Sequence, residues 1–240
     1  MTGNIRAWSA THPGTVRLQN QDACLCRPEI GLFAVADGVG GHAGGEIASG
    51  KVMAMLALIP DDLPPALRVA AIRAALMDTH RGLLHAAAAS GAMMSPATTV
   101  VVLVLQDDHF ACLWAGDSRA YLLRQGQLYP LTTDHSVVQD LVSAGALTED
   151  EAERDPRQHV ITRAIGAGPE NLRLAKAVGQ VLPGDRFLLC SDGLYKALTL
   201  ERITSLMAED MASGDRAQRL ISEALAHAAR DNVTAVVAVL

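Results

Sequence analysis

Five aspartates at the edges of apolar segments are the most informative chemical feature of this sequence. Asp22 precedes the segment 24–26, Asp37 follows 31–36, Asp117 follows the segment 110–115, Asp192 follows 186–190, and Asp231 precedes 232–240. Carboxylates gathered in one place repel one another at neutral pH, and cations between them relieve that repulsion. Carboxylate and carbonyl oxygens are the ligands that Mg²⁺ and Mn²⁺ prefer. Taken singly, each aspartate is more typical of a turn or a helix cap, so a metal site requires a fold that brings them together.

The apolar segments that would position these aspartates predict a mixed protein. We expect strands over 24–26, 31–36, 98–105, 110–115, 119–124, 186–190 and 232–240, and helices over 46–59, 65–89 and 216–229. The connections between 98 and 124 are too short for crossover helices and predict an antiparallel meander. This makes the chain an α+β protein. Two packed antiparallel sheets with helices outside, or a single helix-covered sheet, would both satisfy the pattern.

Composition excludes several classes of protein. The chain has 240 residues and a net charge of −6, which argues against a nucleic-acid binder, because such a protein needs a basic face. No apolar run approaches the roughly 20 residues that span a bilayer, and the first residues lack the apolar core of a signal peptide. We therefore expect one cytoplasmic domain over 1–240 without a membrane partner. Its four cysteines stand in apolar surroundings and are predicted to be buried, reduced thiols.

Other kinds of active site find no support in the motifs. The glycine-rich run 38–46 (GVGGHAGGE) lacks the Lys-Ser/Thr pair of a P-loop and the spacing of a dinucleotide fingerprint. No segment has the pattern of a nucleophile elbow, and no Cys/His pair is evident.

The ordered set of motifs resembles the PPM family of metal-dependent protein serine/threonine phosphatases, the type 2C phosphatases. The motifs are Thr15-Val16-Arg17 with Asn20-Gln21-Asp22, Asp37-Gly38 with Gly40-Gly41-His42, Thr98-Thr99, Gly116-Asp117-Ser118-Arg119, Ser191-Asp192-Gly193 and Asp231-Asn232. The segment 134–168 also resembles the flap of bacterial members. Together the motifs span nearly the whole chain. Gln21 stands where many relatives have Glu, which removes one charge near the expected metals.

The resemblance implies an α/β/β/α sandwich with a two-metal site between the sheets, occupied by Mn²⁺ or Mg²⁺. It implies that Asp37 bridges the two metals, that the Gly38 carbonyl and, through water, Asp22 serve one metal, and that Asp192 and Asp231 bind the other. Asp117 matches the position of an additional, weaker metal, so the expected cofactors are two or three divalent cations. Arg17 would bind the substrate phosphate.

The implied reaction is hydrolysis of phosphoserine and phosphothreonine in proteins. Two metals activate a bridging water and neutralise phosphoryl oxygens, while a guanidinium offers phosphate a planar donor fork. His42 is the candidate acid that protonates the leaving alkoxide; it could equally be a structural loop histidine. The expected protein is a monomer that acts on phosphorylated proteins and opposes a bacterial-type Ser/Thr kinase. A catalytically inactive phosphoprotein-binding module and a hydrolase of small phosphoesters are the alternatives.

Overall fold

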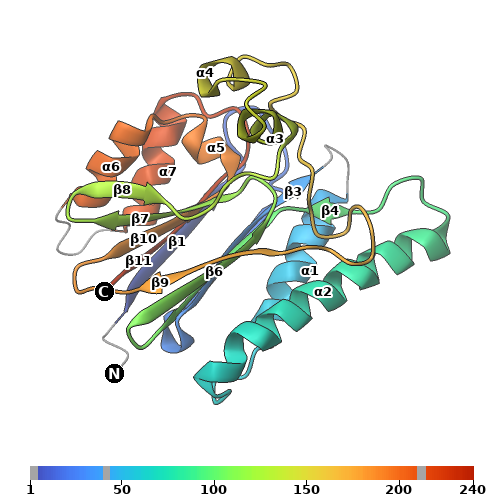
Figure 1. The fold of residues 1–240 in the computed structure, drawn as a ribbon, viewed down its shortest axis with the longest axis horizontal. Coiled ribbons are helices and arrows are strands. Elements are labelled where there is room, and N and C mark those ends of the chain that lie inside the picture. The colour runs from blue at the N-terminus through green and yellow to red at the C-terminus, as the bar shows by residue number, and fades with distance from the viewer. Residues whose placement is uncertain (1–4, 40–43, 210–214) are drawn as a thin grey trace.

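Two antiparallel sheets packed face to face form the centre of the protein, as the computed structural model shows for residues 5–39, 44–209 and 215–240 (Figure 1). One sheet has the order β1 (Arg6–His12), β11 (Val233–Val239), β10 (Arg186–Cys190), β7 (Arg119–Arg124) and β8 (Gln127–Pro130). The other has the order β2 (Asp22–Arg27), β3 (Leu32–Val39), β5 (Val100–Gln106), β6 (His109–Ala115) and β9 (Ala175–Gln180), with β4 (Ala97–Thr98) paired to β3. The 3₁₀ turn η1 (Pro28–Ile30) joins β2 to β3.

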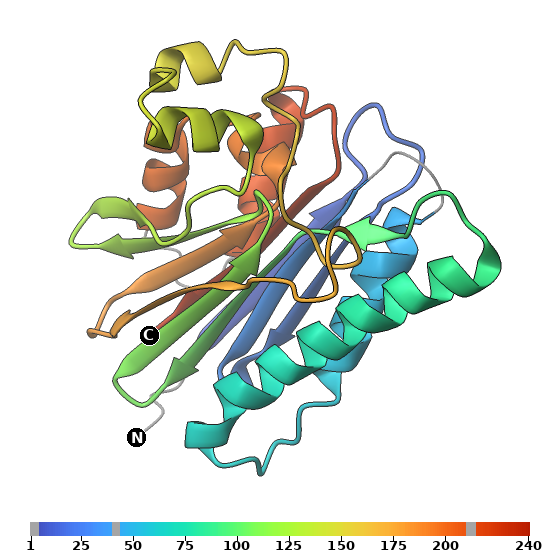
Figure 2. The same cartoon turned by 45° about the vertical axis from the view of Figure 1, so that its right-hand side comes forward.

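Helices cover the outer face of each sheet, so the architecture is the expected α/β/β/α sandwich (Figure 2). Helices α1 (Gly45–Ala57) and α2 (Pro65–Ser90) pack on the second sheet, where Leu56, Ile72 and Leu76 join its core. Helices α5 (Asp192–Tyr195), α6 (Leu200–Ala208) and α7 (Arg216–Ala226) cover the first sheet. The layer between the sheets is mainly aliphatic, with Phe33 and Phe187 fully buried in it. Both faces of the central strands are therefore buried, which explains their nearly continuous apolar sequences.

The predicted meander is correct for β5 and β6 and wrong for β7. Strand β7 pairs with β10 and β8, so residues 116–118 carry the chain from one sheet to the other. Gly116 adopts φ +111°, and a Cβ on it would lie 2.6 Å from the side chain of Thr99. The short connection that suggested a hairpin is thus a crossing between sheets, and it places Asp117 where the two sheets meet.

Other boundaries also differ from prediction. The strand expected over 98–105 is divided at Thr99 into β4 and β5, although both pair with β3 in the same register and the Thr99 backbone N–H donates to the Asp37 carbonyl. Helix α7 ends at Ala226 rather than 229, and Ala228 has a positive φ of 56°. The sequence reasoning missed β1, β8, β9, α3 (Val137–Ser143), α4 (Glu149–Ala152), α5 and α6, which are short or lie on the exposed side of the fold.

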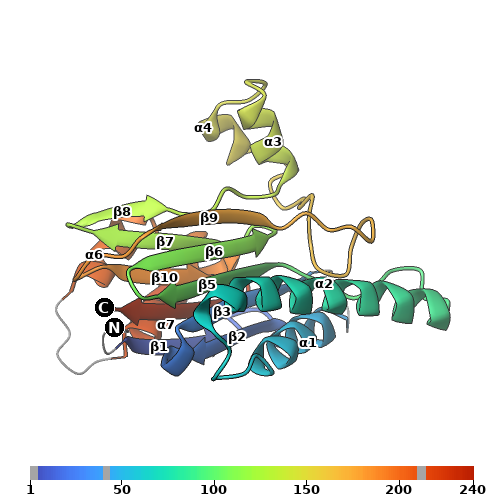
Figure 3. The ribbon, with the colours of Figure 1, turned by 60° about the horizontal axis from the view of Figure 1, so that its bottom comes forward.

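The segment 134–168, predicted to be a flap, carries α3 and α4 and projects away from the two sheets (Figure 3). A bridge between Ser136 and Ile161 joins the two ends of the segment to each other, and a bridge between Thr98 and Ile165 attaches it to the body. Helix α3 begins at Ser136, whose Oγ accepts a hydrogen bond from the Gln139 N–H, and α4 begins with a capping box formed by Thr148 and Glu151.

The cysteines only partly meet the expectation of buried thiols. Cys112 and Cys190 are buried, whereas Cys24 and Cys26 are half-buried on β2 next to β1 and α1; none of the four forms a disulfide. Within the described ranges, no helix combines the length and apolar character needed to cross a bilayer.

Candidate metal and phosphate site

Asp22 and Asp37 face one another across the β2–β3 pair, where they are register partners. Asp22 is buried, and its Oδ2 accepts hydrogen bonds of 2.7 Å from both Ser191 Oγ and Thr234 Oγ1. Thr234 lies on β11 of the opposite sheet, and Ser191 directly follows β10 of that sheet. The Asp22 carboxylate therefore joins the two layers. The other oxygen, Oδ1, is buried without a hydrogen-bond partner. An unpartnered buried carboxylate oxygen is costly, and a cation is the ligand that it suits.

Asp37 and Gly38 lie near the end of β3, which extends to Val39 rather than ending at residue 36. The Asp37 carbonyl accepts hydrogen bonds from Thr98 Oγ1 and the Thr99 N–H, both 2.8 Å long, and its N–H donates to Thr99 Oγ1 at 3.1 Å. A Cβ on Gly38 would lie 2.5 Å from the Gly45 carbonyl carbon at the start of α1. The motif needs glycine here because the helix approaches the strand so closely.

Asp117 and Asp192 come from the first sheet's side of the site. Asp117 is buried in the crossing between β6 and β7, and Tyr195 Oη donates to its carbonyl at 3.1 Å. Asp192 does not end a strand; it is the first residue of α5, and its Oδ2 lies 2.6 Å from Lys196 Nζ one turn later. A Cβ on Gly193 would lie 2.1 Å from the Asn232 carbonyl oxygen, so glycine lets α5 approach the start of β11.

Arg17 and Asp231 form a bidentate ion pair. Arg17 Nε and Nη2 donate to the two Asp231 oxygens at 2.9 and 2.8 Å. The neighbouring Asn232 fastens the loop that carries Arg17: its Nδ2 donates to the carbonyls of Pro13 and Gln19 at 3.0 and 2.9 Å, and its Oδ1 accepts from the Gln21 N–H at 2.8 Å. Residues 231 and 232 therefore position both the guanidinium and the chain that leads into Asp22.

The carboxylates influence one another, which shows that the fold has gathered them. Burial, followed by the charges of Asp22 and Asp192, raises the pKa of Asp37 well above its ordinary value, and Asp117 and Asp231 contribute in the same direction. Burial raises the pKa of Asp22 to about 7 and, together with Asp192, that of Asp117 to about 6. Burial would also raise the pKa of Asp231, but hydrogen bonds from Arg17 and the Asn232 N–H outweigh it and lower that pKa.

The residues fit a divalent cation, although their present arrangement does not enclose one. Among residues 5–39, 44–209 and 215–240, no three Asp, Glu, His or Cys side chains are grouped so as to hold an ion by themselves. Asp231 and Asp192 are paired with Arg17 and Lys196 instead. The all-oxygen donor set and the unpartnered Asp22 Oδ1 are nonetheless suited to Mg²⁺ or Mn²⁺, which retain waters in their coordination shells.

Some parts of this arrangement were not predicted. The sequence reasoning singled out Arg17, Asp22, Asp37, Gly38, Asp117, Asp192 and Asp231, and the structure places all of them around this junction of the sheets. It overlooked Lys196, although its position four residues after Asp192 was the available signal, because opposite charges at this spacing become neighbours on a helix. It also assigned no role to Ser191 and Thr234. His42 lies outside the described residues.

Comparison with known proteins agrees with the motifs. The protein phosphatase 2C family model matches residues 14–230, which is most of the chain. The chain belongs to the protein phosphatase 2C family. The serine/threonine protein phosphatase PstP of Mycobacterium tuberculosis is 37% identical over 235 residues, covering 98% of this chain but only 45% of PstP. Protein phosphatase PhpP of Streptococcus pneumoniae is 31% identical, covering 93% of each protein.

Solved structures of protein phosphatase 2C relatives have the same fold. A structure described as PppA, a key regulatory component of T6SS in Pseudomonas aeruginosa, superposes with a TM-score of 0.89 at 37% identity and covers 99% of both chains. The catalytic domain of PstP in complex with two manganese ions superposes with a TM-score of 0.86 at 34% identity, covering 98% of this chain and 97% of that one. These likenesses confirm the α+β sandwich of two antiparallel sheets with flanking helices.

Proposed function

We propose that this protein is a metal-dependent phosphatase that hydrolyses phosphoserine and phosphothreonine in other proteins. The observation that carries the proposal is the buried Asp22 carboxylate, which lies opposite Asp37 and has one oxygen without a partner. Membership of the family and the manganese ions in the PstP structure support the choice of Mn²⁺ or Mg²⁺. The physiological substrates would include proteins phosphorylated by a Ser/Thr kinase.

Asp22, Asp37, the Gly38 carbonyl, Asp192 and Asp231 would hold two divalent cations, and Asp117 would share a third with Asp192. Such cations supply an activated water and neutralise the charge of the phosphoryl oxygens. The protein contributes a rigid donor set, because Ser191, Thr234, Thr98 and Thr99 fix the carboxylates and the Asp37 backbone through hydrogen bonds. No covalent phospho-enzyme is required.

Arg17 would bind the phosphate of the substrate. Its guanidinium is half-exposed and already directed to the site through Asp231, with a side-chain exposure of 51%. A cation bound by Asp231 would compete with Arg17 for that carboxylate, which frees the planar donor fork for phosphoryl oxygens. Lys196 is paired with Asp192 in the same way, and a cation bound by Asp192 would compete with it for that carboxylate. Without cations, these two ion pairs compensate the charges of Asp231 and Asp192.

His42 remains a prediction from the sequence as the acid that protonates the leaving alkoxide. A serine or threonine alkoxide is a poor leaving group and needs that proton, whereas p-nitrophenolate does not. We propose that segment 134–168 is a flap that selects protein substrates, within one catalytic domain over residues 1–240.

The test is release of phosphate from a phosphothreonine peptide. We expect no activity in excess chelator, restoration by Mn²⁺ or Mg²⁺, and loss of activity in Asp37→Asn. Asp62→Asn, an exposed change between α1 and α2, is the matched control. Full activity in chelator, or in Asp37→Asn, would overturn the metal mechanism. An inactive protein that still binds phosphopeptides would point to a binding module instead.

A further inference from the structure

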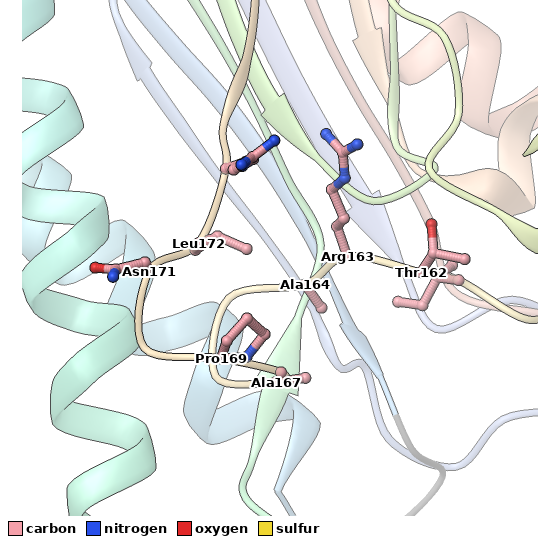
Figure 4. A pocket seen from close by; sticks show the side chains of 10 residues that line it. Thr162, Arg163, Ala164, Ala167, Pro169, Asn171 and Leu172 are labelled. Atoms are coloured by element: carbon pink, nitrogen blue, oxygen red, sulfur yellow. The ribbon is translucent and has the colours of Figure 1, made fainter.

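The segment 161–173 lines a pocket of about 300 Å³ (Figure 4). Its lining is Ile161, Thr162, Arg163, Ala164, Ala167, Gly168, Pro169, Asn171, Leu172 and Arg173. Buried Ala164 and Leu172 form its apolar base, while two guanidinium groups, a hydroxyl and an amide supply hydrogen-bond donors. The lining contains no carboxylate.

Neither arginine of the pocket forms an ion pair with a carboxylate of the described residues. Arg173 has no hydrogen bond or ion pair with any described residue, and Arg163 Nη1 lies 3.1 Å from the imidazole nitrogen Nε2 of His135. The one acidic residue in this segment, Glu170, is directed to His85 on α2 at 3.5 Å. Two guanidinium groups without a carboxylate partner therefore lie in one concave site, and they point to an anionic ligand.

The pocket wall is firmly positioned. His80, fully buried on α2, contacts two points of this segment: Gly166 N–H donates to its Nδ1 at 3.0 Å, and its Nε2 lies 3.0 Å from the Pro169 carbonyl oxygen. A Cβ on Gly166, which has φ +86°, would lie 2.1 Å from the Pro96 carbonyl oxygen. The pocket is thus preformed, which lowers the entropic cost of binding a ligand there.

Two backbone routes join the pocket wall to the candidate site. Ile165 exchanges hydrogen bonds of 2.8 and 3.0 Å with Thr98, whose Oγ1 donates to the Asp37 carbonyl. The Thr162 N–H donates to the His135 carbonyl at 2.7 Å, and the His135 N–H donates to the Gly116 carbonyl next to Asp117 at 3.0 Å. The pocket wall is thus hydrogen-bonded to Thr98, which contacts Asp37, and through His135 to Gly116, which precedes Asp117.

We propose that this pocket binds a second phosphorylated side chain of the same substrate, so that the enzyme favours polypeptides phosphorylated at two nearby residues. The inference rests on the proposed phosphatase function and assigns it a substrate class. A phosphate dianion matches the two positive charges, and guanidinium forks bind phosphoryl oxygens in pairs. The volume accommodates a phosphorylated side chain, and Thr162 and Asn171 offer further polar contacts.

Arg173→Ala is the decisive variant, because Arg173 contacts none of the groups assigned to catalysis. Phosphothreonine peptides carrying a second phosphothreonine two to six residues away on either side would be compared with singly phosphorylated ones. We expect the best-spaced diphosphorylated peptide to have the lower KM for the wild type, and Arg173→Ala to raise that KM roughly 5- to 20-fold while leaving the singly phosphorylated peptide unchanged. Lys176→Ala removes an exposed charge just outside the pocket and should change neither value.

Two further comparisons test whether the pocket recognises phosphate or any negative charge. A peptide with Glu in place of the second phosphothreonine should gain little, and an equal gain would show that the pocket recognises any negative charge. Arg163→Lys keeps the positive charge but loses the planar donor pair, so this variant should retain only part of the preference for the diphosphorylated peptide. Equal KM values for all peptides at every spacing would overturn the inference.

Binding measured without turnover makes the two proposals separable. Anisotropy of labelled peptides in chelator should show tighter binding of the diphosphorylated form and loss of that difference in Arg173→Ala. If the wild type binds both peptides equally tightly, the pocket assignment is overturned, whether or not the protein hydrolyses them. The presence of the difference in a protein that shows no Mn²⁺-dependent hydrolysis overturns only the phosphatase function.

Discussion

Single residues in this site each serve both the structure and the proposed reaction. Asp22 connects the two sheets through Ser191 and Thr234 with one oxygen and leaves the other unpartnered. Asp231 binds Arg17 with both oxygens and also accepts from the Asn232 N–H at 2.9 Å. Replacing such a residue changes stability and chemistry together, so a useful variant must separate the two effects.

Arg17→Ala tests the phosphate-binding assignment. We expect kcat/KM on a phosphothreonine peptide to fall roughly 10- to 100-fold, because one bidentate charge-assisted contact is lost. Stability should change little, since the ion pair is half-exposed and such pairs contribute at most about 1 kcal/mol. Binding of Mn²⁺, followed by titration calorimetry, should be unchanged or tighter, because Asp231 no longer has a competing cation.

Arg17→Lys provides the control for that variant. The ammonium keeps the charge but cannot make the paired contact, so we expect only partial recovery of kcat/KM. Wild-type kcat/KM in Arg17→Ala would show that the residue merely neutralises Asp231.

Asn232→Ala tests how the loop before β2 is positioned. The change removes hydrogen bonds to the backbone of Pro13, Gln19 and Gln21, which is partly accessible to water. A typical hydrogen bond contributes about 0.5–1.5 kcal/mol, so a loss of about 1–3 kcal/mol in the free energy of unfolding is expected by denaturant titration. Activity of the folded fraction should also fall, since Arg17 and Asp22 lose their common anchor. Unchanged stability would show that the loop is fastened elsewhere.

At the scale of elements, close approaches at glycine bring the ligands together. Helix α5 reaches the start of β11 only because Gly193 has no side chain, and the crossing at Gly116 carries Asp117 between the sheets. These short connections, rather than the long helices, determine which carboxylates become neighbours. The long α2 contributes through His80, which fixes the segment 166–169.

Gly193→Ala should push α5 away from β11, because the new Cβ would lie 2.1 Å from the Asn232 carbonyl oxygen. We expect a loss of roughly 2–4 kcal/mol in unfolding free energy, in the range of other overpacked positions, and weaker Mn²⁺ binding as Asp192 moves. Gly50→Ala is the matched control. It lies in α1 with nothing within 4 Å of the added Cβ, and should be neutral or stabilise by up to about 1 kcal/mol. Equal behaviour of the two variants would contradict the packing argument.

For the whole molecule, the gathered carboxylates predict how stability depends on pH when divalent cations are removed. Asp22 has a folded pKa of about 7 and Asp117 of about 6, against an ordinary value of 3.8, and that of Asp37 is raised as well. A raised folded pKa means that the folded state binds the proton more tightly than the unfolded state. Each of these carboxyl groups stabilises the folded state fully below about pH 4, and the contribution is lost as the pH rises through the pKa of the folded state.

In chelator we therefore expect the thermal unfolding midpoint to fall between pH 5 and pH 8. Carboxyls whose pKa is lowered, such as Asp155, which Arg157 brings to about 2, affect stability in a lower pH range. Added Mn²⁺ should raise the midpoint more at pH 8 than at pH 5, because only ionised carboxylates bind it and ligands of the folded state stabilise it. A chelated protein equally stable at both pH values, and indifferent to Mn²⁺, would show that the acidic cluster carries no mutual repulsion.

The sequence alone was enough to predict the class of fold and the principal strands, and to single out the candidate site residues. Central strands such as 100–106 are apolar on both faces, a local property that needs no knowledge of their partners. The aspartates at strand edges and the order of the motifs likewise depend only on residue type and spacing. Short or exposed elements such as β1, α3 and α6 escaped prediction, because their local pattern is weak and their pairing comes from distant parts of the chain.

Only the tertiary structure decided which residues became partners. Nothing in the local sequence distinguishes a hairpin after β6 from a crossing to the other sheet, because strand pairing is set by contacts far apart in the chain. The hydrogen bonds from Ser191 and Thr234 to Asp22 join residues separated by 169 and 212 positions. The pairing of Arg17 with Asp231 and the two uncompensated arginines of the pocket depend equally on how distant segments pack. Local sequence selects the side chains, whereas burial of both sheets against each other selects their neighbours.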